Sequence, residues 1–352
     1  PPPPLPPPSF AAASPPRGPP PPPAPPPWQP WPKPPPSPPP NPCLALVRPR
    51  SNFERCRYLA HAKLDRSLLM FSNLNEVTLS STSLVAANLT EATFQQAVAH
   101  DAAFDFADCD DADFSGADVR RSSFRNATLR EAAFNGAIIH RTNFSRADLR
   151  GASLIGLYQA QSVVLDGANL QGTAISNSWL IRASLVGTNL RAAVVDDVNF
   201  RESLFRGVDF AGATFVDSRF DFADLSGEKL DGVVFEAGHL AWTDLSGASL
   251  QMATFTASVG LTQIDARGAD FSGAVFEGAD LSGARLDGAS LRNARFSSGV
   301  RFTGASIEGT DFTGATGIEP SAFAGATGTA IGFATPPPGG GLGPAGLPVR
   351  RE

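Results

Sequence analysis

A large apolar residue occupies every fifth position over most of this chain of 352 residues. Between Leu59 and Leu154, eighteen of the twenty positions at this spacing hold Leu, Phe, Ile or Val, and the exceptions are Ala99 and Cys109. Between Leu165 and Phe255 all nineteen positions comply, and after two one-residue shifts the pattern continues to Phe312. About fifty units of five residues result. This period fits neither an α-helix, with a period of about 3.6 residues, nor a plain strand, with a period of about 2.

Each unit predicts a short extended piece followed by a turn, as Ala112-Asp113-Phe114-Ser115-Gly116 illustrates. The small residue and the Leu or Phe two positions later point the same way in an extended backbone. The polar residues and glycines that follow are those that turns prefer. Repetition of the unit would coil the chain into a tube with the large apolar residues inside. We therefore expect an all-β chain with negligible helix between Tyr58 and Thr316.

The repeat, read as small, Asp or Asn, Leu or Phe and two polar residues, resembles that of the pentapeptide-repeat proteins over residues 58–316. The resemblance implies a right-handed quadrilateral β-helix with four units, or about twenty residues, per coil. About fifty units would make about twelve coils, and a tube about 60 Å long at a strand spacing of about 4.8 Å. Side chains about twenty residues apart should then stack inside it. The expected columns include Phe104, Phe124 and Phe144, and Phe215, Phe235 and Phe255.

Proline divides the chain, because 26 of its 33 prolines fall in the first 42 residues and none between Arg50 and Glu319. We predict a polyproline II arm at 1–42, a linker or cap at 43–57, the β-helix at 58–316, a degenerate C-terminal cap at 317–335 and a Pro/Gly-rich tail at 336–352. The composition of the arm is typical of a stiff linker. Its Ser14-Pro15-Pro16 and Ser37-Pro38-Pro39-Pro40 runs also resemble hydroxyproline-rich extensin-like segments, which are O-glycosylated outside the cell. A ligand for a polyproline-reading domain is a third interpretation.

The charge is divided in the same way. Residues 1–57 carry a balance of +5 and residues 58–320 a balance of −12, within a formal net charge of −6. An acidic body repels phosphates, so general nucleic-acid binding is not expected. No run approaches the roughly 18 apolar residues of a membrane span. Because the first residue is proline rather than methionine, we expect a processed product or a fragment.

Two kinds of covalent site are candidates. Cys43 and Cys56 flank the entry to the repeats and would either form a disulfide in an oxidising compartment or remain thiols. Cys109 replaces a Leu or Phe and should be buried and inert. N-glycosylation sequons begin at outward positions, although the repeat itself favours Asn; they are Asn88, Asn126 and Asn143.

No catalytic constellation, cofactor motif or metal-ligand cluster stands out, so we expect neither an enzyme nor a cofactor. Residues 341–346 match G-x-G-x-x-G, but no strand precedes them and no helix follows. Aromatic residues at outward positions are few. Phe222 and Trp242 are twenty residues apart and should form an exposed pair, a candidate partner contact together with Trp28 and Trp31 of the arm.

The leading hypothesis is a non-enzymatic structural or scaffolding protein, a rigid rod with a proline-rich arm that carries glycans. It would mediate protein–protein assembly in an extracellular fibre or a cell wall; the cytoplasm or an organelle lumen is the alternative location. Because β-helix ends are open strand edges, protomers could also stack head to tail. The alternative function is an acidic DNA mimic that binds a topoisomerase. The acidic body favours that alternative, and the arginine-rich stretch 120–150 and the proline-rich arm count against it.

Overall fold

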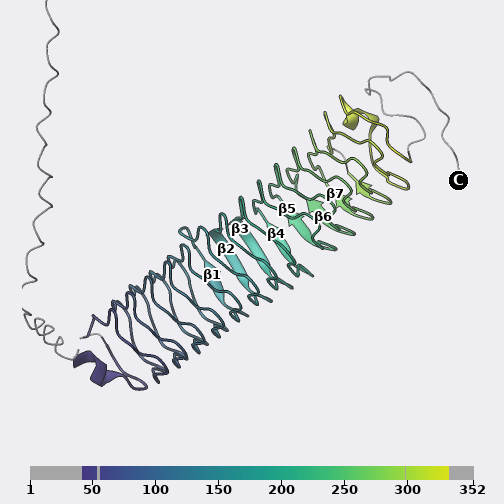
Figure 1. Cartoon of the computed structure of the whole chain (residues 1–352). Helices are drawn as coiled ribbons and strands as arrows, with labels where there is room; N and C mark the ends of the chain where they lie inside the picture. The colour runs from purple at the N-terminus through teal and green to yellow at the C-terminus, as the bar shows by residue number, and fades with distance from the viewer. Residues whose placement is uncertain (1–41, 54–55, 298, 333–352) are drawn as a thin grey trace, which may run out of the picture. The chain divides into compact units, whose positions relative to one another are not determined.

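The computed structural model of this chain describes residues 42–53, 56–297 and 299–332. They belong to the second of two compact units, Asn41–Glu352. The predicted arm, apart from Pro42, and the predicted tail lie outside the described residues, and so do Trp28 and Trp31. The described residues form a parallel β-solenoid whose coils stack along a rod (Figure 1).

The regular elements of the rod are short. They are two 3-10 helices, η1 (Pro42–Leu46) and η2 (Pro320–Phe323), and eight strands, β1 (Ser153–Ile155), β2 (Ala174–Trp179), β3 (Val194–Asn199), β4 (Thr214–Val216), β5 (Val234–Glu236), β6 (Thr254–Thr256), β7 (Val275–Phe276) and β8 (Arg295–Phe296). The strands form one parallel sheet in the order β1 to β8, and isolated parallel bridges join the remaining coils. The residues that the structure describes contain no α-helix. The predicted all-β class is confirmed.

Successive coils pair in steps of twenty residues, as the four-unit coil predicts. One ladder of paired residues runs from Asn52 to Thr316. It has fourteen rungs, each a residue of one coil, and the eight strands supply eight of them. The predicted count of about twelve coils therefore differs from the structure. The prediction began at Tyr58, whereas the ladder begins at Asn52, and another column of bridges reaches Ile331.

Four steps of the ladder are one residue longer, and all four place the extra residue at the same corner of the coil. They separate Asn52 from Asn73, Ser153 from Ala174, Thr254 from Val275 and Arg295 from Thr316. In each coil the extra residue falls where two neighbouring inward positions are six residues apart instead of five, as in Leu154 to Ala160 and Phe255 to Leu261. The one-residue shifts of the sequence are thus absorbed in a turn, and the inward columns stay in register.

The corners explain why Asp or Asn so often precedes the large apolar residue. The side-chain oxygen accepts the backbone N–H two residues later, as in Asp113 with Ser115 (2.9 Å) and Asp280 with Ser282 (3.0 Å). This Asx-type hydrogen bond closes the turn that leads to the next face. The residue after it adopts a positive φ, for which glycine is suited; Gly116 has φ 67°.

Phenylalanine columns fill the interior. Phe124 stacks on Phe104 and Phe144, with ring centroids 4.5 and 5.1 Å apart. Phe235 stacks in the same way on Phe215 and Phe255, at 5.5 and 5.3 Å. Both predicted columns are confirmed. Cys109 is fully buried among them, and burial raises the pKa of its thiol well above the usual value, so it is the inert thiol that the repeat predicted.

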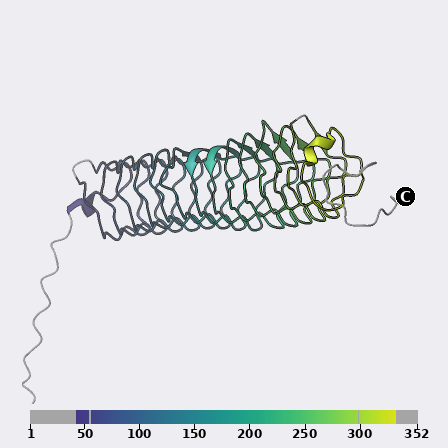
Figure 2. The ribbon, with the colours of Figure 1, turned by 90° about the horizontal axis from the view of Figure 1, so that it is seen from above.

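At the C-terminal end, η2 covers one interior column and lies near the end of the rod (Figure 2). Its Phe323 is 2% exposed and stacks on Phe302, with ring centroids 4.8 Å apart. The bridge between Ser306 and Thr327 continues the ladder beneath this turn. The degenerate segment after Thr316 therefore continues the solenoid as far as Ile331 among the described residues.

Candidate functional site

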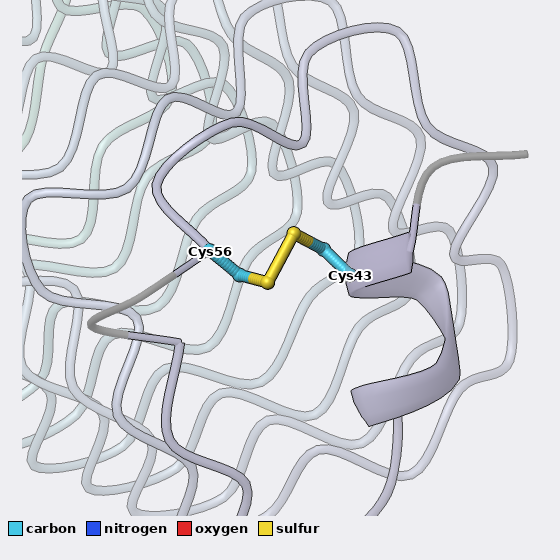
Figure 3. The surroundings of a disulfide bond; sticks show 2 residues. All are labelled: Cys43 and Cys56. Atoms are coloured by element: carbon cyan, nitrogen blue, oxygen red, sulfur yellow. A yellow bond between two sulfur atoms is a disulfide. The ribbon is translucent and has the colours of Figure 1, made fainter. Parts of the chain in front are cut away.

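The structure joins Cys43 to Cys56 by a disulfide, with their Cα atoms 5.5 Å apart (Figure 3). Cys43 lies in η1 and is 8% exposed, and Cys56 lies just before the first predicted unit. Between them Phe53 is fully buried at the start of the core. The bond therefore attaches the N-terminal turn to the first coil.

The three sequon asparagines lie on the outside of the rod and are half-buried. The Oδ1 atoms of Asn88 and Asn143 accept hydrogen bonds from the hydroxyl of their own sequon, from Thr90 at 2.9 Å and Ser145 at 2.6 Å. Asn126 occupies a corner with φ 56°. Their glycosylation stays a prediction.

Phe222 and Trp242 form the outward pair that their spacing predicts. Their rings are parallel within 2°, with centroids 6.3 Å apart, and the residues are 50% and 57% exposed. The stacked pairs inside the core have centroids 4.5–5.5 Å apart. The outer pair is therefore more widely spaced than any interior stack, and both rings remain accessible from outside.

The backbone under this pair is strained. Phe222 and Trp242 both have φ 61°, whereas the same corner two and three coils later holds Gly283 and Gly304. A left-handed conformation costs a residue with a side chain roughly 1–2 kcal/mol. Arg182, Glu202 and Gln263 adopt the same positive φ at this corner in neighbouring coils. The conformation is therefore a property of the repeat and does not by itself single out the aromatic pair.

A charged cluster lies at one end of the pair. The Arg201 guanidinium lies over the Phe222 ring, 5.3 Å from its centroid. Glu202 forms ion pairs with Arg182 at 2.6 Å and with Arg201 at 3.2 Å, and the hydrogen bond from Arg182 holds the pKa of its carboxyl below the usual value. The cation–π contact and these ion pairs orient the rings from one side.

A second exposed pair, Tyr158 and Trp179, was not predicted. The rings meet edge to face, with centroids 5.9 Å apart, and the residues are 56% and 48% exposed. Trp179 ends β2, and its outward position just before buried Leu180 was the sequence signal that could have identified it. Tyr158 lies where the first internal shift of the repeat adds its residue, so periodicity could not place it.

Both pairs belong to one side of the rod. Trp179 pairs with Asn199, Asn199 with Arg219, and Arg219 with His239 in successive coils. Phe222 lies three residues after Arg219, and Trp242 lies three residues after His239. We call the surface formed by Tyr158, Trp179, Phe222 and Trp242 the aromatic face.

A groove of about 500 Å³ continues this side of the rod from the coil of Trp242. Its lining includes His239, Ser258, Gly260, Thr262, Asp280 and Arg301. The Trp242 backbone N–H donates to the Thr262 carbonyl at 3.1 Å, so groove and aromatic pair lie on adjacent coils. Ser258 lies at the corner that takes the extra residues, as Tyr158 does. The extra residues therefore help to shape this side.

Reactive groups are not gathered on the described part of the rod. Within it no three His, Cys, Asp or Glu side chains are placed to hold a metal ion. Two of the dense aspartates near residue 110 are instead paired with arginines one coil later: Asp101 with Arg121 and Asp110 with Arg130, each at 2.6 Å. The hydrogen bond from Arg121 lowers the pKa of Asp101 to about 2. In the same residues, no helix has the length and apolar character needed to span a membrane.

Comparison with protein families identifies the class. A profile described as "Pentapeptide repeats (8 copies)" matches residues 72–105, 82–121, 107–146, 129–157, 168–207 and 196–236. A second, "Pentapeptide repeats (9 copies)", matches residues 271–316. Together these matches cover more than half of the chain, and this chain belongs to the pentapeptide-repeat family.

Solved structures with a similar fold include two described as pentapeptide-repeat proteins. HetL, involved in heterocyst differentiation regulation in Nostoc sp. strain PCC 7120, is 26% identical over 68% of this chain and 88% of its own, with a TM-score of 0.25. A protein of the Arabidopsis thaliana thylakoid lumen is 21% identical over 27% of this chain and 66% of its own, with a TM-score of 0.26. Full-length QnrB1, a plasmid-mediated fluoroquinolone resistance protein, is 16% identical over 64% of this chain and 89% of its own, with a TM-score of 0.20. At such TM-scores these likenesses carry no functional argument. No curated protein matches the sequence.

Proposed function

We propose that this protein is a non-enzymatic scaffold, a rigid rod that binds a protein partner through the aromatic face. The observation that carries the proposal is the exposed, stacked pair Phe222–Trp242, with the Arg201 guanidinium over one of its rings. Exposed Trp, Tyr and Phe side chains are enriched at the energetic centres of protein interfaces. Stacked coils with repeated backbone hydrogen bonds supply a stiff support for such a surface.

We further propose that the protein works in an oxidising compartment, the extracellular space or cell wall being the first candidate. The disulfide between Cys43 and Cys56 supports this location, because reducing compartments keep such thiols free. Assembly into a fibre would use the side of the rod. Head-to-tail stacking has less support, since Phe323 of η2 already covers one interior column at the C-terminal end of the core.

The DNA-mimic alternative rests on the acidic body of the chain. A mimic of duplex charge needs carboxylates that remain available to a partner. Many of the aspartates here are instead engaged by arginines, as Asp118, Asp148 and Asp265 are by Arg120, Arg150 and Arg267. The alternative predicts that micromolar protein inhibits DNA supercoiling by gyrase, and the scaffold predicts no inhibition.

Proximity labelling in the cells that produce the protein tests the scaffold directly. The wild-type chain, a Phe222→Gly/Trp242→Gly variant and a Phe106→Gly control would each carry the labelling enzyme. Phe106 is a matched control because it is 62% exposed and has φ 60°, yet it lies at a different corner. We expect the double variant to lose neighbours that the control retains. An unchanged set of neighbours would refute a role for the aromatic face.

A further inference from the structure

We propose that the rod is jointed at a seam between the coil of Phe210 and the coil of Leu230. One face of the solenoid is open at this seam, the Glu228 side chain holds it open, and the two segments on either side bend relative to each other there. The inference goes beyond the proposed function and does not depend on what the aromatic face binds. It is carried by absent backbone hydrogen bonds, a buried carboxylate between the coils and a cleft at the same place.

The seam is visible in the backbone. An ordinary unit makes three hydrogen bonds to the next coil, two through N–H groups at and after the inward residue and one through the carbonyl two residues before it. The unit of Leu190 makes all three at 2.8–3.0 Å, and the unit of Leu230 makes all three at 2.7–2.9 Å. The unit of Phe210, which lies between them on the same face, makes none of the three, although both of its coils are fully described.

The pairing of residues breaks at the same place. On this face a column of bridges runs through Asp209 and resumes at Lys229, but no bridge joins these two described residues. The other three faces of the two coils stay paired, through Asn199–Arg219, Leu204–Asp224 and Thr214–Val234. The coils therefore part on one side only.

Hydrogen-bond lengths show that the parting is angular. Phe200 lies two units from Phe210 in a coil of four, on the opposite face, and its N–H donates to the next coil at 2.7 Å. On the faces beside the seam the bonds between the coils are longer, 3.2 Å from the Phe205 N–H and 3.4 Å to the Ala213 carbonyl. Two coils that are close along one face and apart along the opposite face have the geometry of an open hinge.

Glu228 accounts for the parting. It takes an inward position where the coils on either side hold Val208 and Ala248. It is 8% exposed, and its carboxylate extends into the wall between the coils. There it accepts the N–H groups of Gly207 at 2.9 Å and Val208 at 3.1 Å. Hydrogen bonds to a charged acceptor are about twice as strong as neutral ones, so the carboxylate is a stable wedge.

A cleft of about 400 Å³ lies beside this wedge. Val208 and Phe210 line it from one coil, and Lys229 and Asp231 line it from the next. Solvent in the cleft can satisfy the Phe210 N–H and the Lys229 carbonyl, which have no backbone partner across the seam. Bending at the seam therefore breaks no backbone–backbone hydrogen bond of this face, and full closure is opposed by the length of Glu228.

The seam also divides the aromatic face. Tyr158 and Trp179 belong to the segment before it, and Phe222 and Trp242 belong to the segment after it. Because each coil of a solenoid contacts only its neighbours, no other element of the described residues ties the two segments together. Bending would change the angle between the two aromatic pairs, so the joint would let them adjust to the shape of the surface that they contact.

Hydrogen exchange of the full chain, resolved to single amides, tests the seam. The Phe210 amide should exchange at least about a hundredfold faster than the Leu230 amide, because only the latter donates to a neighbouring coil. Glu228→Thr should close the seam and remove this difference, since Thr188 fits the same column and its hydroxyl bonds within it at 2.8 Å. Lys229→Ala is the control, because it removes a side chain of the cleft and keeps the wedge, and it should leave the exchange fast.

Distances between paired spin labels test the bending. Glu131→Cys/Met252→Cys places one label on each side of the seam, and Phe71→Cys/Ala192→Cys places both on the first segment. All four are exposed residues of one corner column, and each pair is six coils, or about 29 Å, apart. The native cysteines of the rod form a disulfide and a buried thiol, so they do not take the label. Electron–electron double resonance should give a broader distance distribution for the pair that spans the seam, and Glu228→Thr should narrow it to the width of the control pair.

Three results would overturn the proposal. They are slow exchange of the Phe210 amide in the wild-type chain, equal widths for the two labelled pairs, and a Glu228→Thr variant whose exchange and distances match the wild type. Closure of the seam by Lys229→Ala would equally overturn the role of Glu228. Proximity labelling bears on the partner of the aromatic face and not on the joint, so the two proposals fail separately.

Discussion

Substitution of Phe124 by Ala tests the interior of the solenoid most directly. The Phe124 ring is fully buried and contacts four others: it stacks on Phe104 and Phe144, and it meets Phe114 and Phe134 edge to face at 5.5 and 5.9 Å. Removing such a ring costs about 3–5 kcal/mol, because the transfer free energy is lost and the surrounding coils cannot close the cavity. The free energy of unfolding should fall by this amount.

The control is Phe106→Ala in the neighbouring coil. Phe106 is 62% exposed and has φ 60°, so its loss removes little buried surface. The change in the free energy of unfolding should be within about 0.5 kcal/mol, as for other surface substitutions. Urea denaturation followed by circular dichroism would measure both variants.

Hydrogen exchange would then locate the loss. Because each coil of a solenoid contacts only its neighbours, the Phe124→Ala cavity should lower amide protection mainly in the coils of Phe104 and Phe144. Coils near Phe276 should keep their protection. Equal destabilisation by the two substitutions, or uniform loss of protection along the rod, would show that the assignment of inward and outward positions is wrong.

Three further predictions follow from the ends and the surface of the rod. The Asp101 carboxyl has a pKa of about 2 in the folded protein against an ordinary 3.8, so its contribution to stability is present above about pH 4 and is lost as the pH falls towards 2. Arg121→Gln should return the pKa of Asp101, measured by NMR, towards 3.8. An unchanged pKa would contradict the assigned cause. Reduction of the Cys43–Cys56 disulfide should release η1 and the first coil, with a local loss of up to about 3 kcal/mol in hydrogen exchange; unchanged protection of residues 43–56 would mean that packing alone holds them. Deletion of residues 1–41 should leave the Tm nearly unchanged, because the described coils have a continuous core that begins at Cys43, and a large fall measured by calorimetry would refute this.

The sequence predicts the solenoid well because one rule is repeated about fifty times. A five-residue period places Phe124 and Phe235 inward whatever the details of each turn, and their stacking follows from a coil of twenty residues. The positive φ of Phe222 and Trp242 follows the same period, because the second residue after the inward one adopts it in units along the whole rod, as Glu202 does at the same corner. The period does not report the ion pairs that Glu202 forms beside the rings with Arg182 and Arg201.

The second aromatic pair shows where periodicity fails. Tyr158 follows an added residue, so counting by fives assigns it to no face, and its contact with Trp179 depends on how the longer turn is folded. For a similar reason the sequence alone did not decide whether the two N-terminal cysteines form a disulfide. Cys43 and Cys56 lie before the repeats, where no regular spacing places their Cα atoms relative to each other.

The corner that takes the extra residues also bears on how a gene for such a protein can change. Adding one codon inside a unit would move every later Leu and Phe away from its inward position, and the remaining coils would have to turn their cores outward. At this corner the chain already carries an added residue in four coils, and the interior columns remain aligned through all of them. Small insertions and deletions should therefore survive selection here and nowhere else in the coil. Since this corner borders the aromatic face, descendants of the gene would diversify at the proposed binding surface while inheriting the same core.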